Sequence, residues 1–98
     1  MDKDAILARL REHEPGLKAR GVTHAALFGS RARGDNRPES DIDIMIDFDP
    51  RTIGDVYAYA GLKLYIASLF DGPVDVVNSR GLKPFVHLQA TADAFYAF

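Results

Sequence analysis

Two aspartates, Asp41 and Asp43, lie two positions apart in a segment where polar and apolar residues alternate. If this segment is a strand, both carboxylates point to the same face, about 7 Å apart. Carboxylates this close repel each other, and one takes up a proton unless a cation compensates. Mg²⁺ suits such a pair, because it prefers one or two carboxylates together with phosphate oxygens and water. A third acid, Asp75, lies in the apolar segment 73–77, and the three carboxylates converge if the two strands are neighbours. Alternatively, they are solvent-facing acids on an edge strand.

A glycine–serine pair, Gly29 and Ser30, ends an earlier apolar segment. Gly29 lets the backbone approach a ligand closely. Ser30 adds a hydroxyl donor, and a helical turn beginning there would favour an anion. Arg31 and Arg33 add positive charge, either for a phosphate or a partner, or as part of a solvated loop paired with nearby acids. Carboxylates that hold Mg²⁺ beside a phosphate cradle form a nucleoside triphosphate site.

Other chemistries fit the sequence less well. The glycine spacing after Phe28 resembles a Walker A loop, but Asp35 and Asn36 stand where lysine and serine or threonine are required. The histidines show no metal-ligand spacing. Structural or surface roles are therefore predicted for His13, His24 and His87, whereas Asp47 and Asp49 are predicted to be solvent acids or loop formers.

The segments that must position these residues alternate between helical and extended patterns. Helices are predicted over 3–20, 55–70 and 82–97, strands over 23–28, 41–48 and 74–78, and a loop or one helical turn over 30–40. The first helix could break near Pro15. This order predicts an α/β (α+β) fold, a small mixed sheet of about three strands with helices packed on it. In strand 41–48 the isoleucines and Phe48 form the core face, and the other face is acidic, with Met45 among the aspartates.

Length and composition set further limits. The chain has 98 residues, of which 47% are apolar, so a single domain over 1–98 is expected. It has no cysteine. Its net charge of −2 disfavours direct nucleic-acid binding through phosphates. No secretory signal and no membrane-spanning run are visible, and a cytoplasmic protein is expected.

The Gly-Ser pair and the Asp-x-Asp pair, separated by ten residues, together resemble the signature of the polymerase-β-like nucleotidyltransferase superfamily. The length and the tetrad Arg-Ala-Arg-Gly over 31–34 resemble its minimal branch, the MNT antitoxins of HEPN–MNT toxin–antitoxin pairs. The resemblance implies that Gly29 and Ser30 hold the triphosphate. It implies two Mg²⁺ ions on Asp41 and Asp43, with Asp75 as a third acid and ligand that activates the acceptor hydroxyl.

The resemblance also implies an activity, the transfer of AMP from ATP to a tyrosine of a cognate helical HEPN toxin, which silences an RNase. One alternative is a binding module that neutralises its partner by contact alone. Another is transfer to a small molecule such as an aminoglycoside, which usually needs an extra domain. The short chain leaves no residues for such a domain, so the acceptor is expected to dock on an exposed surface. Residues 55–70 and 95–98 are candidates for that surface or for self-association, unless the core uses them.

Overall fold

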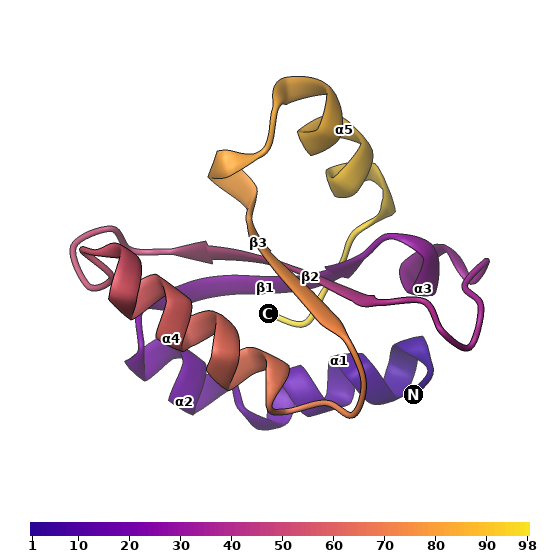
Figure 1. The fold of residues 1–98 in the computed structure, drawn as a ribbon, viewed down its shortest axis with the longest axis horizontal. Coiled ribbons are helices and arrows are strands. Elements are labelled where there is room, and N and C mark those ends of the chain that lie inside the picture. The colour runs from indigo at the N-terminus through magenta and orange to yellow at the C-terminus, as the bar shows by residue number, and fades with distance from the viewer.

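A mixed four-stranded sheet lies between two unequal layers of helices in the computed structural model, which describes residues 1–98. Helices α1, α2 and α4 cover one face, and α5 lies over the other (Figure 1). None of the helices is long and apolar enough to cross a membrane. In chain order the elements are α1 Lys3–Glu12, α2 Glu14–Ala19, β1 Val22–Phe28, α3 Ser30–Arg33, β2 Ile42–Phe48, α4 Val56–Ala67, β3 Val74–Asn78, the 3₁₀ turn η1 Ser79–Gly81, α5 Pro84–Asp93 and β4 Phe95–Tyr96.

The sheet has the strand order β3-β2-β1-β4. Strand β1 pairs antiparallel with β2 and β4, whereas β2 and β3 are parallel and are connected by the crossover helix α4. This topology brings the C-terminal end of β1 and the N-terminal ends of β2 and β3 to the same end of the sheet. The mixed sheet and the α-β-β-α-β-α order of the sequence prediction are confirmed, with a fourth strand added.

The predicted helix over 82–97 is wrong at its end. Helix α5 stops at Asp93, and the following residues form β4 on the outer edge of β1. The backbone N–H of Ala97 donates to the carbonyl of Ala25 at 2.8 Å, and the Nε of Arg11 donates to the carbonyl of Ala97 at 3.0 Å. The open edge of β1 offers unpaired backbone groups, and pairing with them outweighs the weak local helix preference of these residues.

The predicted helix over 3–20 is also divided, at His13. The side chain of Asp2 caps α1 by accepting from the N–H of Ala5, and a second short helix begins at Glu14 with Pro15 in its first turn. Proline has no N–H to donate to the preceding turn, so it is accepted at a helix start and interrupts a helix interior. The break therefore falls before the proline.

The main core lies between the sheet and α1, α2 and α4. Its members include Ile42, Ile44 and Ile46, which confirms the predicted core face of β2. The other face of β2 is not purely acidic, because Met45 is buried in a small cluster with Ala26 and with Ala90 of α5. Helix α5 thus covers the middle of that face and leaves its aspartate end uncovered.

Asp47 departs from its prediction as a solvent acid. It is half-buried and accepts a hydrogen bond from the hydroxyl of Ser79, the one buried polar residue of the protein. This bond fixes η1, the turn that leads from β3 towards α5.

Replacing Ser79 with alanine is expected to lower the free energy of unfolding by about 1–3 kcal/mol, because the half-buried Asp47 loses its partner. Urea denaturation measures the change. The matched control is Ser68→Ala, whose hydroxyl donates to the carbonyl of Tyr65 at an exposed helix end. Equal effects of the two substitutions would contradict the role given to the Ser79–Asp47 bond.

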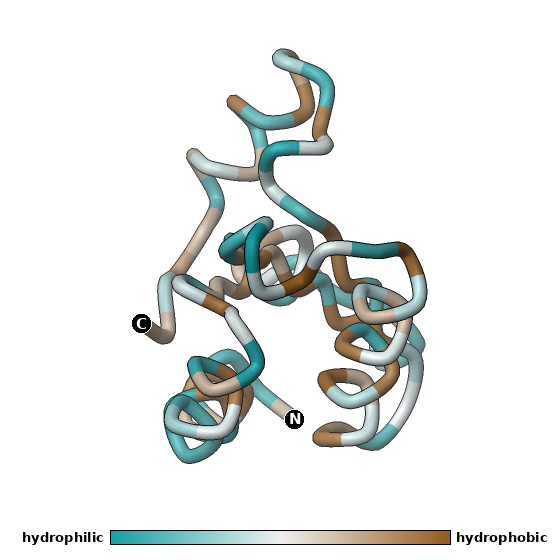
Figure 2. Tube along the Cα trace, turned by 90° about the vertical axis from the view of Figure 1, so that its left-hand side faces the viewer, coloured by the Kyte–Doolittle hydropathy of each residue, from teal (hydrophilic) through white to brown (hydrophobic).

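Two helices leave apolar side chains in solvent. On α4, Tyr57 and Leu64 are 85% and 73% exposed, while Leu62 and Ile66 on the opposite stripe are buried in the core. Figure 2 shows the α5 segment extending away from the sheet with apolar residues among polar ones, and Phe85 at its outer end is 72% exposed. Residues 55–70 therefore serve the core on one stripe and remain available as a surface on the other.

Candidate active site

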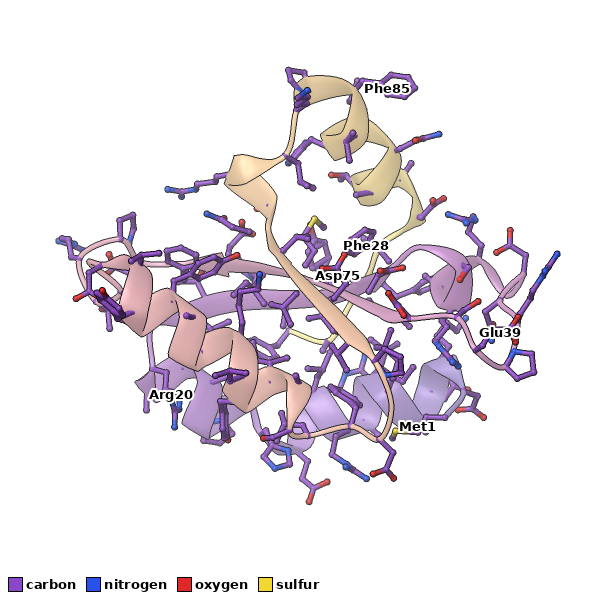
Figure 3. The ribbon with its side chains drawn as sticks, in the orientation of Figure 1. Met1, Arg20, Phe28, Glu39, Asp75 and Phe85 are labelled. Atoms are coloured by element: carbon purple, nitrogen blue, oxygen red, sulfur yellow. The ribbon has the colours of Figure 1, made fainter.

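Two of the three predicted acids, Asp43 and Asp75, lie side by side on the sheet face towards α5. Asp43 pairs in register with Phe28 on one side and with Asp75 on the other, so these three residues form a row across β1, β2 and β3. Figure 3 shows Phe28 and Asp75 on the same side of the sheet. Asp41 precedes β2 and is exposed, Asp43 is half-buried, and Asp75 is exposed. Strands β2 and β3 are neighbours, which is the condition under which the acids of the two segments could converge.

Gly29 holds a backbone conformation that other residues do not adopt readily. Its φ is 77° and its ψ is −156°, a region that is essentially restricted to glycine. A Cβ atom at this position would overlap the carboxylate of Asp43. The glycine therefore makes room for the central acid of the site, a role that the spacing of the motif alone did not indicate.

The electrostatic environment of Asp43 is unfavourable for its negative charge. Burial, then the nearby carboxylates of Asp75 and Asp41, raise the pKa of Asp43, and Arg33 and Arg31 offset this in part. Removal from water and like charges both favour the protonated acid. A divalent cation would reverse the balance.

The chemistry of the donors fits Mg²⁺, because aspartate oxygens are its preferred protein ligands. Among residues 1–98, no three acidic or histidine side chains are already drawn together into a metal-holding cluster. Asp41, Asp43 and Asp75 would hold the cation together, with Asp43 in the centre.

The raised pKa of Asp43 predicts a pH dependence of stability in metal-free protein. The folded state holds this proton more tightly than the unfolded state, where the pKa is about 3.9. The contribution of this proton to the free energy of unfolding is fully present below the unfolded-state pKa. It is lost as the pH rises through the raised pKa of the folded state. We therefore expect urea denaturation with a chelator present to show that the free energy of unfolding of wild type falls relative to that of Asp43→Asn as the pH rises. A difference independent of pH would contradict this reading.

Helix α3 provides the turn predicted after Gly29. Ser30 opens it and is half-buried, and Gly34 closes it in a left-handed conformation with φ 85°. The backbone N–H groups of Ala32 and Arg33 bond to the carbonyl of Gly29 at 3.1 Å. The Gly-Ser pair thus lies at the start of a helical turn beside the aspartate row.

Arg31 makes contacts that neither sequence interpretation described. Its Nε and one terminal nitrogen donate to the carbonyl of Ser40 at 3.2 and 2.8 Å, and its other terminal nitrogen donates to the carbonyl of Met1 at 3.1 Å. It is paired with neither Asp35 nor Glu39. Arg31 therefore holds the loop that leads to Asp41 and β2.

Arg33 joins α3 to α5. It contacts Asp35 at 3.1 Å, as the solvated-loop interpretation expected, and also Asp93 at the end of α5 at 2.8 Å. Both contacts are partly exposed, so each contributes little energy by itself. The contact with Asp93 connects α3 to the end of α5, which lies near Gly29.

Two open clefts flank the aspartate row. One, of about 470 Å³, lies between Phe28, Gly29 and α5. The other, of about 370 Å³, lies along β3 and is lined by Asp75 with Tyr59 and Lys63 of α4. The site therefore has one opening on the Gly-Ser side and another on the Asp75 side.

Comparison with known proteins agrees with this geometry. The sequence profile described as "Nucleotidyltransferase domain" matches residues 6–94, and the chain belongs to this family. It is thus an enzyme of the nucleotidyltransferase class.

Individual relatives are similar over most of the chain. The protein adenylyltransferase MntA of Thermococcus cleftensis is 35% identical over 81 residues, which cover 82% of this chain and 80% of that protein. A solved structure described provisionally as a minimal nucleotidyltransferase superposes with a TM-score of 0.75 and 36% identity, covering 97% of this chain and 95% of the other. A toxin–antitoxin complex with AMP-PNP contains a chain with a TM-score of 0.68 and 26% identity, at 100% and 73% coverage.

Proposed function

We propose that this protein transfers AMP from ATP to a tyrosine hydroxyl of a cognate HEPN-type toxin, with Mg²⁺ as cofactor, and thereby acts as its antitoxin. The observation that carries the proposal is the row formed by Asp43 and Asp75 beside Gly29, whose missing side chain accommodates the Asp43 carboxylate. The name of the Thermococcus relative supports AMP transfer to a protein. The toxin–antitoxin complex supports a toxin as partner and an adenine nucleotide as substrate.

The two sides of the row take different parts in the proposed reaction. Gly29 and Ser30 hold the triphosphate on the β1 side, and Asp75 faces the acceptor on the β3 side. The acceptor oxygen bonds to the α-phosphorus, the bond from that phosphorus to the β-phosphate oxygen breaks, and pyrophosphate leaves with the electron pair. The hydroxyl proton passes to the Asp75 carboxylate and then to solvent. Mg²⁺, when bound, supplies positive charge to the phosphate oxygens and lowers the pKa of the attacking hydroxyl.

The acceptor has access to the row from solvent. Asp75 is exposed, and the cleft along β3 is lined by Tyr59, Lys63 and Leu82. A tyrosine on a protein surface can reach such an open position, whereas a small molecule would find few groups there to enclose it. This favours a protein acceptor.

The proposal is tested by incubating the purified protein with Mg²⁺ and ATP labelled at the α-phosphate, in a lysate of its source organism. Parallel reactions contain γ-labelled ATP and an Asp41→Ala/Asp43→Ala double variant. We expect one protein band that carries the α-label only and is absent with the double variant. Mass spectrometry of that band is expected to find AMP on a tyrosine.

Neutralisation by contact alone gives a different result. In that case the double variant protects cells from the partner toxin as well as wild type does, and no protein band is labelled. Labelling by γ-labelled ATP would indicate transfer of a phosphate and would overturn the proposal.

A further inference from the structure

The α5 wall of the cleft on the Gly-Ser side has no role in the reaction described so far. It lies between the end of β1 and one face of α5, and it connects directly to Gly29. Its volume of about 470 Å³ falls within the range of small-molecule sites, about 300–1,000 Å³. Five residues of α5 line it, and four of them lie on one face of the helix at spacings of three or four residues: Val86, Gln89, Ala90 and Asp93, with Ala92 as the fifth.

The walls of the cleft combine apolar surface, one neutral amide and the ion pair of Arg33 with Asp93 at one end. Phe28 forms the floor on β1, and Val86 and Ala90 lie opposite on α5. Gln89 is exposed and adds both a hydrogen-bond donor and an acceptor. Arg33 closes one end, where its ion pair with Asp93 holds α5 in place. Away from that ion pair, aromatic and apolar walls with a single amide suit a planar heterocycle better than a charged group.

The position of the cleft relates it to the nucleotide. Phe28 pairs in register with Asp43, and Gly29 lines the cleft while also bordering the Asp43 carboxylate. A triphosphate held at Gly29 and Ser30 with its α-phosphate over the aspartate row therefore has its nucleoside within reach of Phe28. The cleft along β3 is separated from this position by the row itself and remains for the acceptor.

We propose that the cleft between Phe28 and α5 is the nucleobase site, in which Phe28 stacks on the base and Gln89 selects adenine. This inference rests on the proposed function. The Hoogsteen edge of adenine presents one donor and one acceptor, which a glutamine amide matches with two hydrogen bonds. The same edge of guanine presents two acceptors, so the amide can satisfy only one of them.

The test is calorimetric titration of the full-length protein with ATP and with GTP in Mg²⁺. Phe28→Leu keeps an apolar side chain but removes the aromatic face, and it is expected to weaken ATP binding about tenfold. Gln89→Leu is expected to weaken ATP binding more than GTP binding, because adenine loses two hydrogen bonds and guanine loses one, so that the preference for ATP falls. Leu88→Ala, on the outer face of the same helix and 71% exposed, is the matched control and is expected to bind ATP like wild type. Thermal melting verifies that each variant is folded.

The outcomes separate this inference from the proposed function. If wild type binds ATP and the Phe28 and Gln89 variants bind it equally well, the nucleobase site is overturned while the proposed function stands. The same holds if the variants lose the capture of an acceptor protein but not ATP binding, because the cleft then contacts the partner. If wild type binds no nucleotide, the proposed function fails and the inference with it. An unchanged ATP-to-GTP ratio in folded Gln89→Leu overturns the selection by the amide.

Discussion

Replacing Asp43 with asparagine is expected to lower the rate of AMP transfer by about three orders of magnitude and to leave the fold intact. Asp43 is in register with Asp75 on β3, and Asp41 lies two positions earlier along the chain. The amide retains the shape of the side chain but removes the charge that binds the cation, and loss of such electrostatic stabilisation costs about 10²–10³-fold or more. The rate is measured with α-labelled ATP and purified acceptor.

The stability of this variant distinguishes a catalytic effect from a folding defect. Because burial and like charges already oppose the ionised form of Asp43, thermal unfolding at neutral pH without metal is expected at an equal or higher temperature. Added Mg²⁺ is expected to raise the melting temperature of wild type more than that of the variant. The control is Asp71→Asn in the exposed turn before β3, which is expected to keep its transfer rate. Full activity in Asp43→Asn would refute the proposed mechanism.

Replacing Gly29 with alanine is expected to impair both stability and catalysis. The backbone conformation costs about 1–3 kcal/mol for a residue with a side chain. In addition, the new methyl group displaces the Asp43 carboxylate, and a shift of about 1 Å in a reacting group can cost about 10²-fold in rate. Urea denaturation and the transfer assay measure the two effects.

A second glycine separates strain from displacement. Gly72 also has a positive φ, 91°, but a Cβ atom there would meet nothing within 4 Å. Gly72→Ala is expected to lose stability like Gly29→Ala and to keep its transfer rate in proportion to folded protein. If both variants transfer AMP equally well, contact between residue 29 and the Asp43 carboxylate does not matter for catalysis.

The positions of Asp43 and Asp75 on their strands were predictable because both residues belong to short local patterns. Alternation in 41–48 placed Asp43 on the face opposite the isoleucines, and a strand at 74–78 placed Asp75 where it could become a neighbour. The register that pairs these two residues depends on the crossover through α4, which no local pattern encodes. The sequence predicted that the acids converge if the two strands are neighbours. In the sheet these two strands are neighbours.

The parts that the sequence did not predict are contacts between distant segments. Residues 95–96 form a strand only because β1 has an open edge, and Met45 is buried only because Ala90 of α5 rests on it. The contact of Arg33 with Asp93 joins residues 60 positions apart. Such contacts depend on tertiary packing, which overrides local preference.

The mixed sheet has a consequence for the order of folding. Strands β1 and β2 form an antiparallel pair across a short connection, so Gly29 and Asp43 can meet early. Parallel pairing of β3 requires the whole α4 crossover and closes a much longer loop, which makes it slower. Asp75 is therefore expected to reach its place beside Asp43 last. The charge repulsion between the two residues then arises only at the final stage of folding. Asp75→Asn would then mainly slow unfolding, which makes the acid-rich site a determinant of how long the folded protein persists.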